Sequence, residues 1–168
     1  MHYKQKNQLF NYAVHWLGAP ILAVALTLWP TLISGLSILQ TDPGDTLLNH
    51  YFPEHAYQHV RDGQLLNPDH FWSRQYFWPI KDTLTWSDHL IGPAFIYGAL
   101  RQIFVDPYNT YVAWITLTLF LNYISLRKAL KTISPKTSPT WLSIITIITP
   151  YSPAITIQLG HPQLLAFT

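Results

Sequence analysis

The sequence predicts an all-α membrane protein, a fragment of a polytopic helical bundle with one large extracytoplasmic loop. Three observations predict this fold class. Only 11% of the 168 residues are charged, whereas soluble domains carry about 25%. The run Trp16–Leu39 contains no charged residue. All eight Asp and Glu residues fall within the single segment 42–106.

Composition also excludes several function classes. The chain has no cysteine, so disulfide scaffolds, thiolate zinc sites and cysteine nucleophiles are ruled out. A net charge of +2 is too small to indicate nucleic acid as a partner. The sequence contains neither a Gly-rich phosphate loop nor a GxSxG motif, so a soluble nucleotide-dependent mechanism has no support.

The first expected membrane span covers residues 16–39 and follows a short N-terminal segment, 1–15. It exceeds the roughly 20 residues that a helix needs to cross the hydrocarbon core. Pro20 and Pro30 do not argue against it, because membrane helices tolerate proline. The run is also longer than the apolar region of a signal peptide, so we expect a retained span.

Positive charge predicts the topology. Lys4 and Lys6 precede the first span, and a second expected span, 107–127, ends on a basic cluster that continues into the segment 128–139. Because Lys and Arg favour the cytoplasmic side, we expect the N-terminus and 128–139 to be cytoplasmic. The loop 40–106 then lies outside the cytoplasm.

Two further segments complete the expected organisation. Residues 88–104 are apolar, but the run is short and contains Arg101, which favours a helix in the outer interface over a crossing. The segment 140–168 begins a third span that Pro150, Pro153 and Pro162 break. We therefore expect the chain to be part of a longer protein.

The loop begins with a surface helix expected over residues 46–60, whose apolar positions predict an amphipathic helix. Asp45 precedes it. One interpretation is an N-cap that accepts backbone N–H bonds; the other is a catalytic carboxylate at the mouth of the bundle. Asp42, before Pro43, is open to the same two interpretations.

Histidines on this helix carry a second ambiguity. His50 and Glu54 are spaced to pair on one helical face. His55 and His59 have a spacing that metal ligands use. The alternative is a solvated polar face, because no carboxylate completes an HExxH motif.

The rest of the loop combines aromatic, acidic and basic residues. Its aromatic patch fits an interfacial belt or a platform for a sugar or isoprenoid; it comprises Tyr76, Phe77, Trp78 and Trp86. Ser87 or Asp88 fits a cap of the following helix; alternatively, Asp88 and His89 act as a general base and its partner. The basic side chains fit lipid headgroup contacts or a phosphate site; they are Arg61, Arg74, Lys81 and Arg101.

The order of these motifs resembles the amino-terminal region of bacterial polytopic GT-C-type membrane glycosyltransferases. The resemblance rests on short elements in sequence: Gly44-Asp45, Glu54-His55, Phe77-Trp78-Pro79, Ser87–Gly92, the SPY-like Pro150–Pro153, and Leu159–Leu165.

The resemblance implies a multi-pass plasma-membrane enzyme that transfers a sugar from a polyprenyl-phosphate carrier to an acceptor on the extracytoplasmic side. It implies that Asp45 is the catalytic carboxylate, with Asp42 and Asp88 as the next choices. Basic side chains or a bound divalent cation would stabilise the departing phosphate. The residues expected to bind substrate or lipid phosphate are Glu54, His55, His89, Arg61, Arg74, Arg101, Trp78, Trp86 and His161.

An alternative function class uses the same residues without catalysis. In a non-enzymatic polytopic membrane protein, such as a lipid or polysaccharide translocator or an assembly subunit, the loop charges would serve as structural and headgroup contacts. The two classes differ in the role of Asp45.

Overall fold

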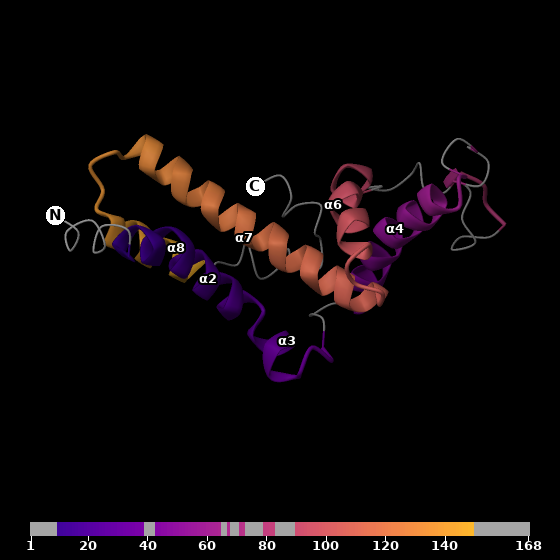
Figure 1. Ribbon diagram of the computed structural model, residues 1–168, viewed down its shortest axis with the longest axis horizontal. Coiled ribbons are helices and arrows are strands. Elements are labelled where there is room, and N and C mark those ends of the chain that lie inside the picture. Colours follow the sequence, from indigo (N-terminus) through magenta and orange to yellow (C-terminus); the bar gives the residue numbers. More distant parts are fainter. Residues whose placement is uncertain are drawn as a thin grey trace. The chain divides into compact units, whose positions relative to one another are not determined.

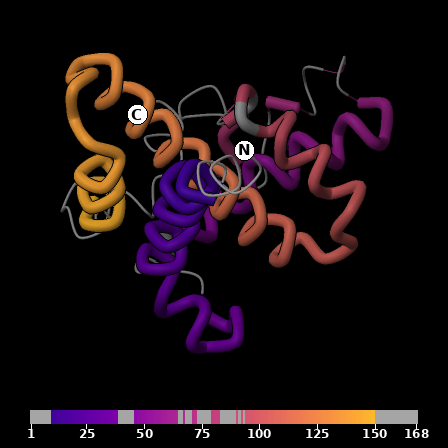
Figure 2. The backbone as a smooth tube through the Cα atoms, turned by 60° about the vertical axis from the view of Figure 1, so that its left-hand side comes forward, coloured from indigo at the N-terminus to yellow at the C-terminus, as the bar shows by residue number. Residues whose placement is uncertain are grey.

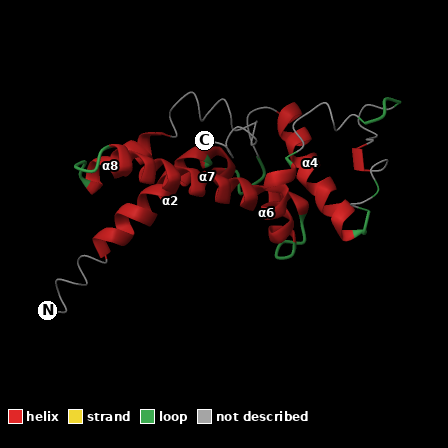
Figure 3. Cartoon of the chain, turned by 90° about the horizontal axis from the view of Figure 1, so that it is seen from above, coloured by secondary structure: helices red, strands yellow, loops and turns green. Residues whose placement is uncertain are grey.

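The computed structural model describes residues 10–38, 43–64, 67, 71–72, 79–82 and 90–149, and within these residues the protein is all-helical (Figures 1 and 3). This confirms the all-α prediction. The chain divides into two compact units. The first contains η1, α2, α3, the second half of α7, and α8; the second contains α4, α6 and the beginning of α7.

The first unit opens with helical residues that the two prolines divide. The π-helix η1 (Val14–Gly18) leads into α2 (Ala19–Thr27) and then α3 (Trp29–Ile33). Pro20 has no N–H for the carbonyl of Trp16, and the Ala19 N–H instead bonds to the carbonyl of Val14, in the wider π pattern. A turn at Leu28 separates α2 from α3 two residues before Pro30, so the expected single helix over 16–39 is interrupted.

One helical stretch among the described residues, Phe10–Thr27, is long and apolar enough to cross a membrane, and 28% of it is buried. It lies near the N-terminus, and a signal sequence or the core helix of a soluble protein can meet the same criterion. The finding is therefore compatible with the expected first span and does not establish a polytopic protein.

The rest of the first unit is formed by α7 (Pro107–Ile133) and α8 (Pro139–Ile148). The α7 helix continues past residue 127, so Lys128 and Lys131 lie on the helix and not in a loop. The α8 helix packs on α2, and the hydroxyls of Thr27 and Tyr123 lie 2.6 Å apart, which joins α2 to α7.

The second unit pairs α4 (Pro43–Arg61) with α6 (Ile91–Arg101), which lie side by side (Figure 2). The α4 helix begins before the expected residue 46, so Asp45 lies within the first turn and not at the N-cap position. The α6 helix is shorter than the expected 88–104. Leu90, in the left-handed conformation with φ 49°, occupies its N-cap position. A helix of this length spans about 16 Å, too little to cross a hydrocarbon core of about 30 Å.

Candidate functional site

The second unit contains a partly buried ion pair between α4 and α6. Arg101 Nε donates to Glu54 Oε2 at 2.8 Å, and Arg101 Nη2 donates to Glu54 Oε1 at 3.1 Å. The two side chains are only 11% and 12% exposed, respectively. This bidentate geometry, in a setting that excludes most water, is the stronger form of a carboxylate–guanidinium contact.

Two neutral side chains complete the surroundings of the Glu54 carboxylate. The hydroxyl of Tyr97, a fully buried residue, donates to Glu54 Oε2 at 2.7 Å, and Gln58 Nε2 donates to Oε1 at 3.0 Å. Burial alone would raise the pKa of Glu54, but the hydrogen bonds from Arg101, Tyr97 and Gln58 outweigh it and hold the pKa below its usual value. Burial, together with the bond to Glu54, raises the pKa of Tyr97, so Tyr97 remains a neutral donor.

Arg101 also fastens the C-terminal end of α6. Its Nη1 donates to the carbonyl oxygens of Phe104 and Val105, just beyond the helix, and its guanidinium lies 5.1 Å from the ring centroid of Tyr57. These contacts give Glu54 and Arg101 a structural role as a cross-link between two helices. Their use in binding substrate or phosphate stays a prediction.

His50 contacts the beginning of α7. Its Nε2 lies 3.1 Å from the carbonyl oxygen of Pro107, and its ring packs 4.8 Å from that of Tyr111. Burial lowers the pKa of His50 below its usual value, which favours the neutral imidazole at pH 7. The hydrogen-bond partner of His50 is thus a backbone carbonyl, in place of the Glu54 carboxylate expected from their spacing.

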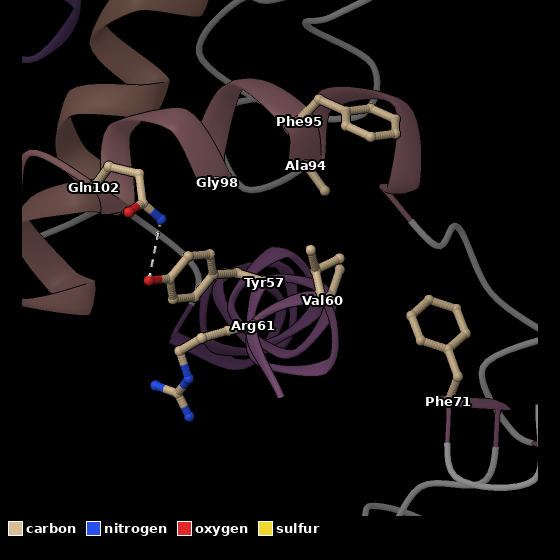
Figure 4. A pocket seen from close by; sticks show the side chains of 9 residues that line it. Tyr57, Val60, Arg61, Phe71, Ala94, Phe95, Gly98 and Gln102 are labelled. Carbon is tan, nitrogen blue, oxygen red and sulfur yellow. Dashed lines mark hydrogen bonds between the residues drawn. The ribbon is translucent and has the colours of Figure 1, made fainter. Parts of the chain in front are cut away.

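A groove of about 310 Å³ lies between α4 and α6, close to the lower limit for ligand pockets. Apolar side chains form most of its wall, and polar groups lie toward one side (Figure 4). Gln102 Nε2 donates to the Tyr57 hydroxyl at 3.4 Å there. The lining residues are Ala56, Tyr57, Val60, Arg61, Phe71, Ala94, Phe95, Gly98 and Gln102.

Sequence reasoning did not identify this groove. It exists because small residues, Ala56 on α4 with Ala94 and Gly98 on α6, face one another across a long separation in sequence. The local sequence indicates only that Ala94 and Gly98, one helical turn apart, form a face of small residues on one helix. That spacing does not predict which helix packs against this face.

A histidine pair lies on α4. The rings of His55 and His59 have centroids 3.7 Å apart, and Phe71 lies 5.8 Å from each of them. No group of three or more metal-ligating side chains occurs within the described part of the chain. The structure therefore brings the predicted pair together without a third protein ligand from that set.

The remaining predicted residues are placed only in part. Arg61 lines the groove and is exposed, and its Nε donates to Asp62 Oδ1 at 2.8 Å. The backbone of Asp45 lies in the first turn of α4. Seven predicted residues lie outside the described residues: Asp42, Arg74, Trp78, Trp86, Asp88, His89 and His161.

No protein-family model, curated protein sequence or solved structure matches this chain. The glycosyltransferase resemblance in the sequence therefore has no support from these comparisons, and the argument for function rests on the chain itself.

Proposed function

We propose that this chain belongs to a polytopic plasma-membrane glycosyltransferase that transfers a sugar from a polyprenyl-phosphate carrier to an acceptor on the extracytoplasmic side. The observation that carries the proposal is the groove between α4 and α6. It lies in the segment that the charge distribution predicts to be extracytoplasmic, and it combines an apolar wall with a cationic edge.

This combination suits an amphiphilic lipid carrier. Val60, Phe71 and Phe95 offer a surface for isoprene units, whose transfer from water is favourable in proportion to the apolar area buried. Arg61 lies toward the polar side of the groove. It follows Asp45 by 16 residues of α4, about 24 Å at 1.5 Å per residue, so the groove would hold the isoprenoid tail of the carrier while its phosphate and sugar lie near the beginning of the helix.

In the proposed reaction, Asp45 acts as general base. It takes the proton of the acceptor hydroxyl, the acceptor oxygen forms a bond to the anomeric carbon, and the bond from that carbon to the phosphate oxygen breaks. The polyprenyl phosphate leaves with the electron pair. Basic side chains, or a divalent cation, stabilise its charge.

The ion pair between Glu54 and Arg101 favours the second candidate function, a non-enzymatic polytopic membrane protein. Glu54 and Arg101 contact one another and the polypeptide backbone, as expected where loop charges serve to hold helices together. A translocator or assembly subunit needs no catalytic carboxylate, so Asp45 separates the two candidates.

The test measures release of polyprenyl phosphate from a panel of polyprenyl-phosphate hexoses by membranes that contain the full-length protein. Asp45→Asn should abolish release at normal expression. Ala94→Phe, which fills the groove, should raise KM for the donor with a smaller effect on kcat. Gly98→Ala is the matched control, because the added methyl group would lie 3.8 Å from Tyr57 Cδ2, an ordinary contact.

Release by Asp45→Asn equal to that of the wild type would remove Asp45 from catalysis. Absence of release from every donor by the wild-type protein, with normal folding, would favour the non-enzymatic candidate.

A further inference from the structure

We propose that the exposed face of α6 and the loop that follows it, residues 102–105, dock into the surface of a lipid bilayer. Ile103, Phe104 and Val105 enter the boundary between headgroups and acyl chains. The partner is the hydrocarbon of the bilayer and not a charged headgroup. The proposal depends on the predicted membrane association of the chain, but it is independent of sugar transfer, because its test measures contact with lipid alone.

The α6 helix is apolar on two faces. Ala94 and Tyr97 are buried on the side that packs on α4. On the other side Phe95 is 77% exposed, and Ile96 and Ala99 are exposed as well. A helix that is apolar all round is normally covered by protein or by lipid. The exposed face of α6 therefore calls for a partner.

The apolar surface continues beyond the helix. Ile103 and Val105 are 72% and 90% exposed, and Phe104 between them is also exposed. Contiguous exposed apolar groups mark contacts with another protein or with a membrane. Residues 102–105 include no charged side chain, so this loop suits acyl chains better than a charged partner.

Much of the backbone of this loop is hydrogen-bonded within the protein. The N–H groups of residues 102, 103 and 104 donate to carbonyls in the last turn of α6. The carbonyl oxygens of Phe104 and Val105 accept hydrogen bonds from Arg101 Nη1. Where water is scarce, backbone polar groups must find partners inside the protein. These bonds therefore lower the cost of placing the loop among lipid.

Arg101 is the only charged residue of α6, and its charge is balanced. Its guanidinium is paired with the Glu54 carboxylate, and the two side chains are only 11% and 12% exposed. Moving a lone cation toward hydrocarbon would be costly. The ion pair removes much of that cost, and the same guanidinium supplies the hydrogen bonds to the loop carbonyls.

The place of the loop in the chain favours a bilayer over a protein partner. The loop leads into α7 at Pro107, and the 20 residues 107–126 include no charged side chain. About 20 residues are needed to cross the hydrocarbon core. Residues 103–105 thus directly precede the predicted second span, at the point where the chain would meet the bilayer surface. Helices that lie in this interface bury their apolar face about 5–10 Å deep.

The test exploits the absence of native cysteine. Phe95→Cys, Ile103→Cys and Val105→Cys are each made in the full-length protein, spin-labelled and reconstituted into phosphatidylcholine vesicles. Electron paramagnetic resonance then compares collisions of the label with oxygen, which concentrates in hydrocarbon, and with a water-soluble nickel chelate. The ratio of oxygen to nickel collisions should be at least about fivefold higher than for the exposed Gln64→Cys on the same unit, because the labels lie beneath the headgroups.

A ratio at positions 103 and 105 equal to that at Gln64 would overturn the proposal, because the loop would then lie in water. Labels shielded from both reagents would also overturn it and would indicate a protein partner, such as a second copy of the chain. Leu121→Cys, at an exposed position of α7, is the reference for hydrocarbon. A lipid-like ratio there, with aqueous ratios at 103 and 105, would reject docking of the loop while leaving the predicted span in place.

Discussion

At the residue scale, Glu54 is held by several side chains in the second unit. Three side chains, Arg101, Tyr97 and Gln58, donate to its two oxygens. The consequence is a carboxylate that is largely buried yet ionised. Removing the Glu54 carboxylate would destabilise the fold chiefly through Arg101. The guanidinium would remain without its charged partner, and an unpaired cation shielded from water costs more free energy than a paired one.

We expect Glu54→Gln to lower the free energy of unfolding by about 1.5–3 kcal/mol at pH 7, the range for hydrogen bonds to charged groups, because Arg101 would lose its charged partner. The measurement is denaturant unfolding of the purified chain. Gln58→Glu is unsuitable as a control, since it adds a charge beside Glu54. Gln58→Ala, which removes one neutral donor on an exposed side chain, should cost much less.

The same pair gives a pH signature. The pKa of Glu54 is lower in the folded chain than its usual value of 4.5, so its contribution is present above the unfolded pKa and is lost as the pH falls through the folded pKa. The difference between wild type and Glu54→Gln should therefore shrink in acid. A difference that stays constant down to pH 3 would contradict the assigned ionisation.

The sequence allowed part of this site to be predicted. Glu54 and Arg101 were each expected to bind substrate or lipid phosphate, Glu54 through the resemblance and Arg101 as one of the basic side chains of the loop. Their mutual contact was not expected, since it depends on how α4 packs on α6 across a separation of 47 residues. Tyr97 gave no sequence signal at all, because a buried tyrosine on an apolar helix resembles any other core residue.

At the scale of elements, Arg127 joins α7 to α8 in the first unit. The residue is fully buried. Its Nη1 donates to Ser143 Oγ at 3.0 Å and its Nη2 to the carbonyl of Pro139 at 3.3 Å. Its guanidinium also lies 5.1 Å from the ring centroid of Trp16. The helices of this unit contain no Asp or Glu, so neutral acceptors and an aromatic ring take the place of a carboxylate.

Ser143→Ala should therefore destabilise the first unit by about 1.5–3 kcal/mol, the range for hydrogen bonds to charged groups. Ser143 Oγ serves both Arg127 and His15, whose Nδ1 lies 2.9 Å away. The measurement is the unfolding free energy in detergent, with the exposed Ser125→Ala on α7 as control. Equal stability of the two variants would show that Arg127 does not depend on this hydroxyl.

The elements themselves were predictable to different degrees. Apolar periodicity and length predicted helices at 46–60 and 107–127, and the structure extends both. The basic residues after residue 126 were expected to form a cytoplasmic cluster. Of these, Arg127 is buried within the first unit. The interruption at Leu28 follows from Pro30, whose effect had been discounted on the ground that membrane helices tolerate proline.

At the scale of the whole chain, the division into units follows the distribution of acidic residues. The helices of the first unit carry no Asp or Glu, whereas the eight acids fall within 42–106, inside the range that includes α4 and α6. A chain that segregates charge in this way is well suited to a membrane protein whose polar part lies on one side. The positive-inside tendency predicts that this side is the exterior.

Labelling with an impermeant thiol reagent tests this topology directly, because the chain has no native cysteine. In intact cells, Leu66→Cys should react when the reagent is added outside, since position 66 belongs to the expected extracytoplasmic loop. Lys136→Cys, in the expected cytoplasmic segment, should react only after lysis. The reverse pattern would mean that the orientation is the opposite of the one proposed.

External reaction at both positions would contradict a crossing by α7 and would leave the helix Phe10–Thr27 as the sole candidate span among the described residues. The proposed extracytoplasmic transfer reaction would then lose its topological basis.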